Sequence, residues 1–324
     1  MTARAVNDTV NDIKLHNIGN DRHTIQHITR CSKLALPYIS SIENGYEQEF
    51  AEEWEAFAAV YHYQGWYSEG ETMLKRALAG YEKALEPKHL DTLRVVQNLG
   101  LYYHDHGKLD EAETMWKQAL AGYKKALGLE HPDTLNVVQN LGMLYYSCGK
   151  LDEAETMWKQ ALAGYKKALG LEHPDTLRVV QNLGMLYYGR GRIDEAEAMW
   201  KQALAGFEKA LGLEHRDTLT VVQNLGTLYY CRGKINEAET MWKQALAGFE
   251  KTGILEDKAI LDTYYKLGVL YEQRSRPAEA VMVFQHATTG YENLLGPQDP
   301  ETLDAADHLA LVRKMEADRD MALS

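Results

Sequence analysis

The chain has 324 residues, 45% of them hydrophobic, and its 47 acidic residues outnumber its 35 basic ones to give a formal net charge of −12. This composition excludes a disordered tail, and the acidic excess disfavours binding to nucleic-acid phosphates. No stretch approaches the roughly 18 consecutive apolar residues that a membrane span needs, so no membrane contact is expected.

Residues 1–46 do not repeat anywhere in the chain. We expect them to form a cap along the first hairpin; the alternative is that they lie in the groove as an internal ligand. His23, His27 and Cys31 are spaced four apart and would share one helical face, but no fourth zinc ligand is evident, so neither a metal nor a cofactor is expected. The polar start lacks a secretory signal and the three cysteines show no CxxC spacing, which favours a cytoplasmic location.

The rest of the sequence repeats with a period of 42 residues. The run from Leu109 to Lys150 returns as Leu151 to Arg192, with four of 42 positions changed. Weaker copies precede and follow this block, and a half copy begins near Glu301. Such a period is the signature of stacked supersecondary units. We count six hairpins and one closing helix, which places a solenoid at 47–318 and a tail at 319–324.

Each period predicts two helices. In the first helix, apolar residues from Leu93 to Tyr103 recur at three- and four-residue steps, and Asp91 or Thr92 can cap its start. Gly107 marks the turn, and the second helix runs from about Asp110 to Leu127. Neither helix can bury its apolar face within one hairpin, so neighbouring hairpins must stack.

These motifs resemble a known family. The chain resembles the tetratricopeptide repeat in the spacing of L-G-x2-Y, then G, then E-A, then an aromatic residue, then A-L. It resembles the kinesin-light-chain subtype of this family in its 42-residue period and its H-P-D-T-L motif. Arrays in fungal nucleotide-binding receptor proteins are also similar, although this chain has no P-loop. The resemblance implies an all-α, right-handed α-solenoid. It also implies that the repeated Trp (Trp116, Trp158, Trp200, Trp242) is buried core.

In that family the first helix of each hairpin lines the concave surface, where a ligand sits. The resemblance implies that a repeated Asn row grips the backbone of an extended peptide, because a side-chain amide both donates and accepts hydrogen bonds. The alternative is that Asn and Gln tie adjacent hairpins together; the aromatic row could stack on a ligand or pack in the core. The candidate ligand-binding residues are Asn98, Asn140, Asn182, Asn224, Gln139, Gln181, Arg94, Arg178, Tyr146, Tyr188 and Tyr230.

Several candidate groove positions differ between near-identical copies, among them Asn136/Arg178 and Met185/Thr227. Variable positions beside a constant amide row would suit backbone gripping combined with side-chain selection; drift among recently duplicated positions is the alternative. The sequence therefore favours a non-enzymatic scaffold whose partner is a peptide segment of another protein.

Two other functions stay open. The bowl of a solenoid could hold a small molecule or a reaction, with His104, Tyr146 and Tyr188 as leading residues. His104 lies beside Asp105, but the sequence shows no paired nucleophile and no P-loop, GxSxG, HExxH or dinucleotide fingerprint. Similar repeats can also stack end to end, so a homodimer is possible.

Overall fold

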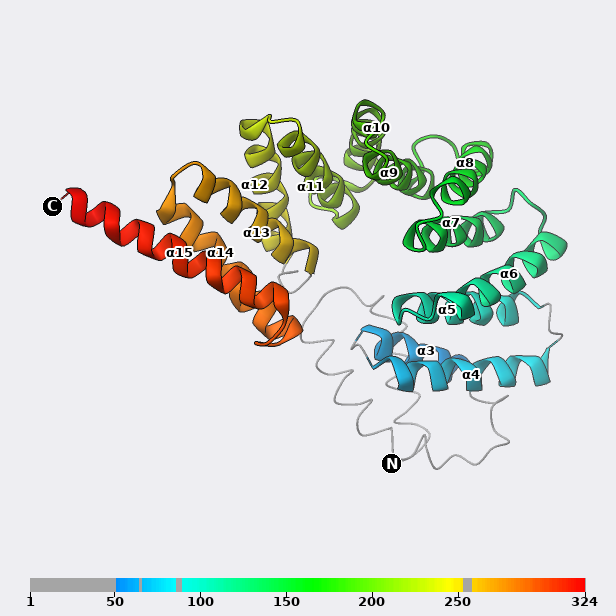
Figure 1. The fold of residues 1–324 in the computed structure, drawn as a ribbon. Helices are drawn as coiled ribbons and strands as arrows, with labels where there is room; N and C mark the ends of the chain where they lie inside the picture. Colours follow the sequence, from blue (N-terminus) through cyan, green and yellow to red (C-terminus); the bar gives the residue numbers. More distant parts are fainter. Residues whose placement is uncertain (1–50, 64–65, 86–88, 253–257, 324) are drawn as a thin grey trace. The chain divides into compact units, whose positions relative to one another are not determined.

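The computed structural model describes residues 51–63, 66–85, 89–252 and 258–323, and within these ranges the secondary structure is thirteen α-helices and no strand (Figure 1). They form six helical hairpins followed by a closing helix, which confirms the predicted α-solenoid architecture. The proposed N-terminal cap (1–46) and His23, His27 and Cys31 lie outside the described residues. The helices are α3(Ala51–Tyr63), α4(Tyr67–Ala84), α5(Leu90–Asp105), α6(Leu109–Ala126), α7(Pro132–Ser147), α8(Leu151–Ala168), α9(Pro174–Gly189), α10(Ile193–Leu211), α11(Arg216–Cys231), α12(Ile235–Thr252), α13(Lys258–Gln273), α14(Pro277–Leu295) and α15(Pro300–Leu323).

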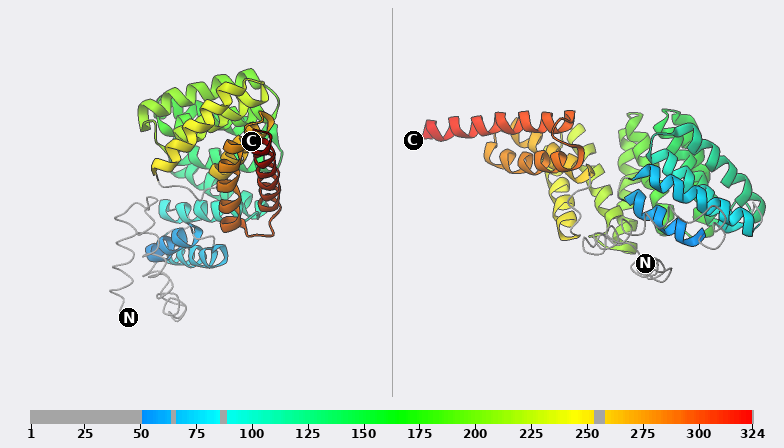
Figure 2. Two further views of the ribbon diagram at one scale, coloured as in Figure 1. Left: turned by 90° about the vertical axis from the view of Figure 1, so that its left-hand side faces the viewer. Right: turned by 90° about the horizontal axis from the view of Figure 1, so that it is seen from below.

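The structure divides into two compact units at Leu171/Glu172. Unit 1 contains the hairpins α3/α4, α5/α6 and α7/α8, with α4 packed on α5 and α6 packed on α7. Unit 2 contains the hairpins α9/α10, α11/α12 and α13/α14, stacked in the same order, with α15 packed on α14 (Figures 1 and 2). Each unit is thus a stack in which a hairpin is stabilised by its neighbours in sequence.

A histidine caps the first helix of most hairpins. The Nδ1 atom of His131 accepts a hydrogen bond from the backbone N–H of Asp133, 3.2 Å away, and Pro132 occupies the first helical turn. The sequence suggested Asp or Thr as the cap, but the histidine before them is the residue whose side chain satisfies a free N–H. The same bond occurs at His89, His173 and His215.

The threonine and leucine of the H-P-D-T-L motif attach the first helix to its surroundings. The hydroxyl of Thr134 donates to the carbonyl of Gly128 at 2.7 Å, which ties α7 to the end of the preceding hairpin. The side chain of Leu135 packs against Gly164 of α8 so closely that a Cβ on this glycine would lie 2.4 Å from the leucine. The motif therefore fixes both the turn between hairpins and the packing inside one.

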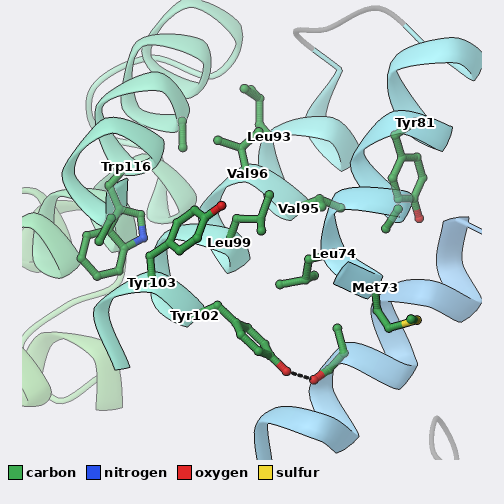
Figure 3. Close-up of a cluster of buried hydrophobic side chains, with 14 of the residues drawn as sticks. Met73, Leu74, Tyr81, Leu93, Val95, Val96, Leu99, Tyr102, Tyr103 and Trp116 are labelled. Carbon is green, nitrogen blue, oxygen red and sulfur yellow. Dashed lines mark hydrogen bonds between the residues drawn. The ribbon is translucent and has the colours of Figure 1, made fainter. Parts of the chain in front are cut away.

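The repeated tryptophan fills the interior of four hairpins, and Figure 3 shows Trp116 among the buried side chains around α5. The indole of Trp116 in α6 lies against Gly100 of α5, where an added Cβ would be 2.5 Å from the ring. Its Nε1 donates to the backbone carbonyl of Gln97 at 3.0 Å. The four tryptophans of this row retain at most 2% exposure, so their predicted core role is confirmed. Gly107, with φ of +73°, supplies the left-handed residue that ends α5.

A second set of contacts joins hairpins on the side of the second helices. Glu113 of α6 lies 2.7 Å from Lys117 on the same helix and accepts a hydrogen bond from Tyr145 of α7 at 3.0 Å. We call this repeated cluster the glutamate clamp; the other clamp glutamates with described partners are Glu71, Glu155, Glu197 and Glu239. Hydrogen bonding from Lys117 lowers the pKa of Glu113, so the clamp carboxylate stays ionised.

Candidate functional site

The Asn row lies on the first helices α5, α7, α9 and α11, and its members differ in their surroundings. Asn98 donates to the carboxylate of Glu55 in α3 at 2.9 Å, and Asn140 donates to Asn136 one turn earlier at 3.3 Å. Asn182 and Asn224 make no hydrogen bond with other described residues. The row is thus occupied in unit 1 and has unpaired amides in unit 2.

Asn182 is the most buried member of the row, with 9% exposure. Its side-chain oxygen and nitrogen are nevertheless not sealed from solvent. Most of the side chain is therefore enclosed while its amide still meets water. A ligand that supplies hydrogen bonds to an enclosed amide of this kind is stabilised by them.

One period after Asn224 the row continues as Lys266 of α13. Its ammonium is half-buried and has no ion pair within the described part of the chain. Burial lowers the pKa of Lys266, and the nearby charge of Asp262 opposes this shift only in part. Asp262 itself is engaged by Tyr291, whose hydroxyl donates to it at 2.6 Å.

The Gln row contains side chains that tie neighbouring hairpins together and side chains without a partner among the described residues. Gln223 is buried and donates to the backbone carbonyl of Ala259 at 2.5 Å, which ties α11 to α13. Gln97 likewise bridges α5 and α7 through its bond to Asn136 at 2.7 Å. The candidates Gln139 and Gln181 are half-buried, and their side-chain amides have no hydrogen-bond partner among the described residues.

The two candidate arginines are held in ion pairs. Arg178 reaches Asp175 on its own helix at 2.7 Å and Asp217 on the next first helix at 3.0 Å. Arg94 bridges Asp91 and Glu55 of α3 in the same manner. Burial raises the pKa of Glu55, although the guanidinium of Arg94 opposes the shift. Both arginines therefore join neighbouring hairpins. A ligand could contact either guanidinium only while it is also paired with these carboxylates.

The aromatic row rests on the tryptophan core. The ring of Tyr188 lies with its centroid 5.6 Å from that of Trp200, and the corresponding distances for Tyr146, Tyr230 and His104 to their tryptophans are 5.8, 5.6 and 5.7 Å. The row also reaches the next hairpin: the Tyr188 hydroxyl lies 3.0 Å from the sulfur of Cys231, and Tyr230 donates to Gln273 at 2.9 Å. Burial, with the Cys231 contact, raises the pKa of Tyr188 to about 12.

In unit 1 the equivalent contacts form a continuous polar chain. His62 lies 2.7 Å from Asp105, whose other oxygen lies 3.0 Å from Nδ1 of His104. The Nε2 atom of His104 lies 3.2 Å from the hydroxyl of Ser147. Burial alone would raise the pKa of Asp105, but the hydrogen bonds from the two histidines outweigh it and lower this pKa to about 2. The chain joins α3, α5 and α7.

Ser147, His104 and Asp105 have the order of a nucleophile, a base and an orienting acid; the repeat pattern places Ser147 among the groove positions but does not show its contact with His104. The surroundings do not suit acyl transfer. The backbone N–H groups of Cys148 and Gly149 are bonded to carbonyls of α7, at 2.9 and 3.0 Å, and cannot stabilise an oxyanion. The group also lies where α5 and α7 end, and the negative ends of helix dipoles disfavour an oxyanion. The other enzyme candidates, Tyr146 and Tyr188, lie in different units.

Two further features bear on the chemistry of the described residues. No group of three or more His, Cys, Asp or Glu side chains among them is arranged to hold a metal ion. A hollow of about 420 Å³ lies in unit 2, away from the candidate rows. It is lined by side chains of α10, α11 and α12 and by Lys234, and its charged Glu197 is already paired with Lys201 at 2.6 Å.

Comparison with protein-family models matches tetratricopeptide repeat models to residues 51–125, 98–167, 133–209, 179–251 and 260–301. A comparison with curated proteins gives no match. Within the described residues, no helix is both long and apolar enough to cross a membrane.

Solved structures of the same fold include a putative kinesin light chain with nearly identical TPR-like repeats from Podosopora anserina, 27% identical, which covers 65% of this chain and 99% of that chain with a TM-score of 0.52. BtubC (BKLC) from P. vanneervenii is 20% identical and covers 71% of this chain and 92% of that one, with a TM-score of 0.59. A Rap protein complexed with competence and sporulation factor is 14% identical and covers 97% and 86%, with a TM-score of 0.64.

Proposed function

Because the chain belongs to the tetratricopeptide repeat family, we propose that it is a protein-interaction scaffold which binds an extended peptide segment of a partner protein along its first helices. The Asn row makes the main contacts, through hydrogen bonds between side-chain amides and the peptide backbone. A solved relative in fold, the Rap protein, is complexed with competence and sporulation factor, which supports ligand binding by such an array.

The observation that carries this proposal is the pair of unpaired amides at Asn182 and Asn224. They lie one period apart on adjacent first helices of unit 2, so both can face one extended chain. Neither side-chain amide has a protein partner within the described ranges, and a peptide backbone supplies both the donor and the acceptor that such an amide can bond. Asn98 and Asn140 are already bonded within unit 1, so unit 2 contributes most of the backbone contacts.

The residues between the amides select the peptide. Met185 and Thr227 occupy equivalent half-buried positions three residues after Asn182 and Asn224, and they differ in size and polarity. A constant amide row with variable neighbours holds the backbone of many peptides and favours those whose side chains fit. We place the protein in the cytoplasm because its three cysteines show no CxxC spacing, as is usual for a reduced compartment.

A displayed library of random peptides, selected on the full chain, tests the proposal. The dissociation constant of a selected peptide is then measured for the wild type, for Asn182→Ala/Asn224→Ala, and for the control Asn293→Ala on the exposed surface of α14. We expect the double variant to bind about fivefold to a hundredfold more weakly, since each lost hydrogen bond is worth about 0.5–1.5 kcal/mol. Unchanged affinity in the double variant, with its melting temperature preserved, would remove the Asn row from the binding site.

A further inference from the structure

The closing helix α15 exposes a leucine whose counterparts in five hairpins are buried. Leu303 occupies the repeat position of Leu93, five periods later in the sequence. It is 46% exposed, whereas the other leucines of its row are 1–2% exposed; these are Leu93, Leu135, Leu177, Leu219 and Leu261. In each of those hairpins a glycine of the second helix lies against the leucine. Leu303 therefore marks the face of α15 on which a second helix would pack.

No hairpin turn follows within α15 to bring such a helix back. Other first helices end at a residue with positive φ, such as Gly107 at +73° or Ser275 at +55°. The equivalent residue in α15 is Ala317, which lies inside the helix, and α15 continues to Leu323. Figure 2 shows the outer end of α15 extending beyond α14. The face of Leu303 is therefore open for a helix from outside the hairpin.

This open face is apolar with one charge of each sign beside it. Leu303, Ala306 and Ala310 lie at three- and four-residue spacing on one side of the helix, and Ala317 extends the same side by two turns. Asp307 and Lys314 border this side, seven residues apart, and neither makes an ion pair with another described residue. Arg313, on the same face, is turned toward Gln285 of α14 and bonded to it.

We propose that the open face of α15 binds α15 of a second copy of this chain, with the two helices antiparallel. A two-fold axis near Ala310 brings Asp307 of each copy opposite Lys314 of the other, so the pattern is complementary to itself. In a parallel pair the flank that carries Asp307 and Lys314 in one copy would lie on the opposite side of the interface from the same flank of the other copy, so these charges would not pair. Flanking charges set helix orientation in this way in coiled coils, where the apolar seam alone does not distinguish the two directions.

The geometry gives the interface a modest size. At 1.5 Å per residue, the 24 residues of α15 span about 36 Å, and the apolar seam uses the part from Leu303 to Ala317. A single helix pair of this length, with one leucine and several alanines per copy, makes a small contact. The dimer is therefore expected to dissociate on dilution.

Light scattering of the full chain over a concentration series tests this proposal. The mass should rise from 36.8 kDa toward twice this value as concentration increases. Leu303→Asp should abolish the rise, whereas the control Leu213→Asp, an exposed leucine between α10 and α11, should leave it unchanged. A constant monomer mass, or loss of association in both variants, would overturn the proposed face.

A charge exchange tests the orientation. Asp307→Lys places two lysines opposite each other in both symmetric pairs and should weaken association, while Asp307→Lys combined with Lys314→Asp restores it. Equal association in the wild type and the single variant would contradict the antiparallel arrangement. Circular dichroism melting of each variant distinguishes lost association from lost folding, because these residues lie on the surface of a helix that α14 supports.

Discussion

The indole nitrogen of Trp158 in α8 donates a hydrogen bond to the backbone carbonyl of Gln139 in α7, 3.1 Å away. Gln139 directly precedes Asn140, so a buried core residue fixes the backbone that carries the candidate amide row. Gly142 permits this arrangement, because a Cβ there would lie 2.5 Å from the same nitrogen. Core packing and the placement of the candidate site are therefore coupled in each hairpin.

Gly142→Ala tests this coupling. The added methyl group must displace the ring of Trp158, and overpacking of this kind costs about 1–3 kcal/mol of unfolding free energy. Chemical denaturation should show the loss, while the control Ala163→Ser on the exposed side of α8 should stay within about 0.5 kcal/mol of the wild type. Equal stability of the two variants would mean that the close Gly–Trp contact carries little of the packing energy.

The glutamate clamp predicts a salt-sensitive loss in Glu197→Gln. Glu197 pairs with Lys201 and Arg232, and hydrogen bonding from Lys201 lowers its pKa. Because a lowered folded pKa gives stability above the unfolded value, this contribution disappears as pH falls through the folded pKa. At neutral pH we expect a loss of about 1 kcal/mol, smaller at high salt. Glu237→Gln, at an exposed position of α12, is the control; equal losses would contradict the clamp.

The pKa of Asp105, about 2, predicts acid sensitivity in unit 1. Its reference value is 3.8, so the stabilisation is complete above about pH 4 and is lost as pH falls toward 2. Asp105→Asn should lower the unfolding free energy at pH 6 by about 1–2 kcal/mol, after a discount for partial exposure. The difference in unfolding free energy between the wild type and Asp105→Asn should shrink at pH 2 to 3. Asp318→Asn, on the exposed end of α15, should not show this pH dependence.

An exchange of Met185 and Thr227 tests peptide selection. The double variant Met185→Thr/Thr227→Met keeps the composition of the two positions and reverses their order along the row. Peptides selected on it should show an altered apolar preference at two positions, while its melting temperature stays within a few degrees of the wild type. Identical selected sequences would show that these residues do not contact the peptide.

The 42-residue period was sufficient to predict six hairpins, the closing helix and the buried tryptophans, because stacked repeats place equivalent residues in equivalent surroundings. The partners of polar side chains were harder to predict. The clamp joins residues 32 and 37 positions apart, as from Glu239 to Tyr271 and Arg276, and such distances depend on how hairpins stack. The recurrence of Glu with a Lys four residues later was the available signal.

The candidate rows show the same limit. Asn98 and Asn182 share the seven residues before them and the two after them, yet the side chain of Asn98 is bonded to Glu55 and that of Asn182 is unpaired. The difference arises because the degenerate first hairpin supplies a glutamate where the other copies have glutamine. A repeat unit read alone cannot reveal this, since the partner belongs to the neighbouring copy.

A double-mutant cycle between the protein and a selected peptide tests the central proposal most directly. One arm is Asn182→Ala, and the other replaces a single peptide-bond N–H of the ligand by an ester oxygen, at each position in turn. If the Asn182 amide bonds to the peptide backbone, one ester position should show a coupling energy of about 0.5–1.5 kcal/mol by titration calorimetry. The same cycle is then measured with Asn224→Ala. Additive losses of binding free energy at every ester position in both cycles would contradict backbone recognition by the Asn row.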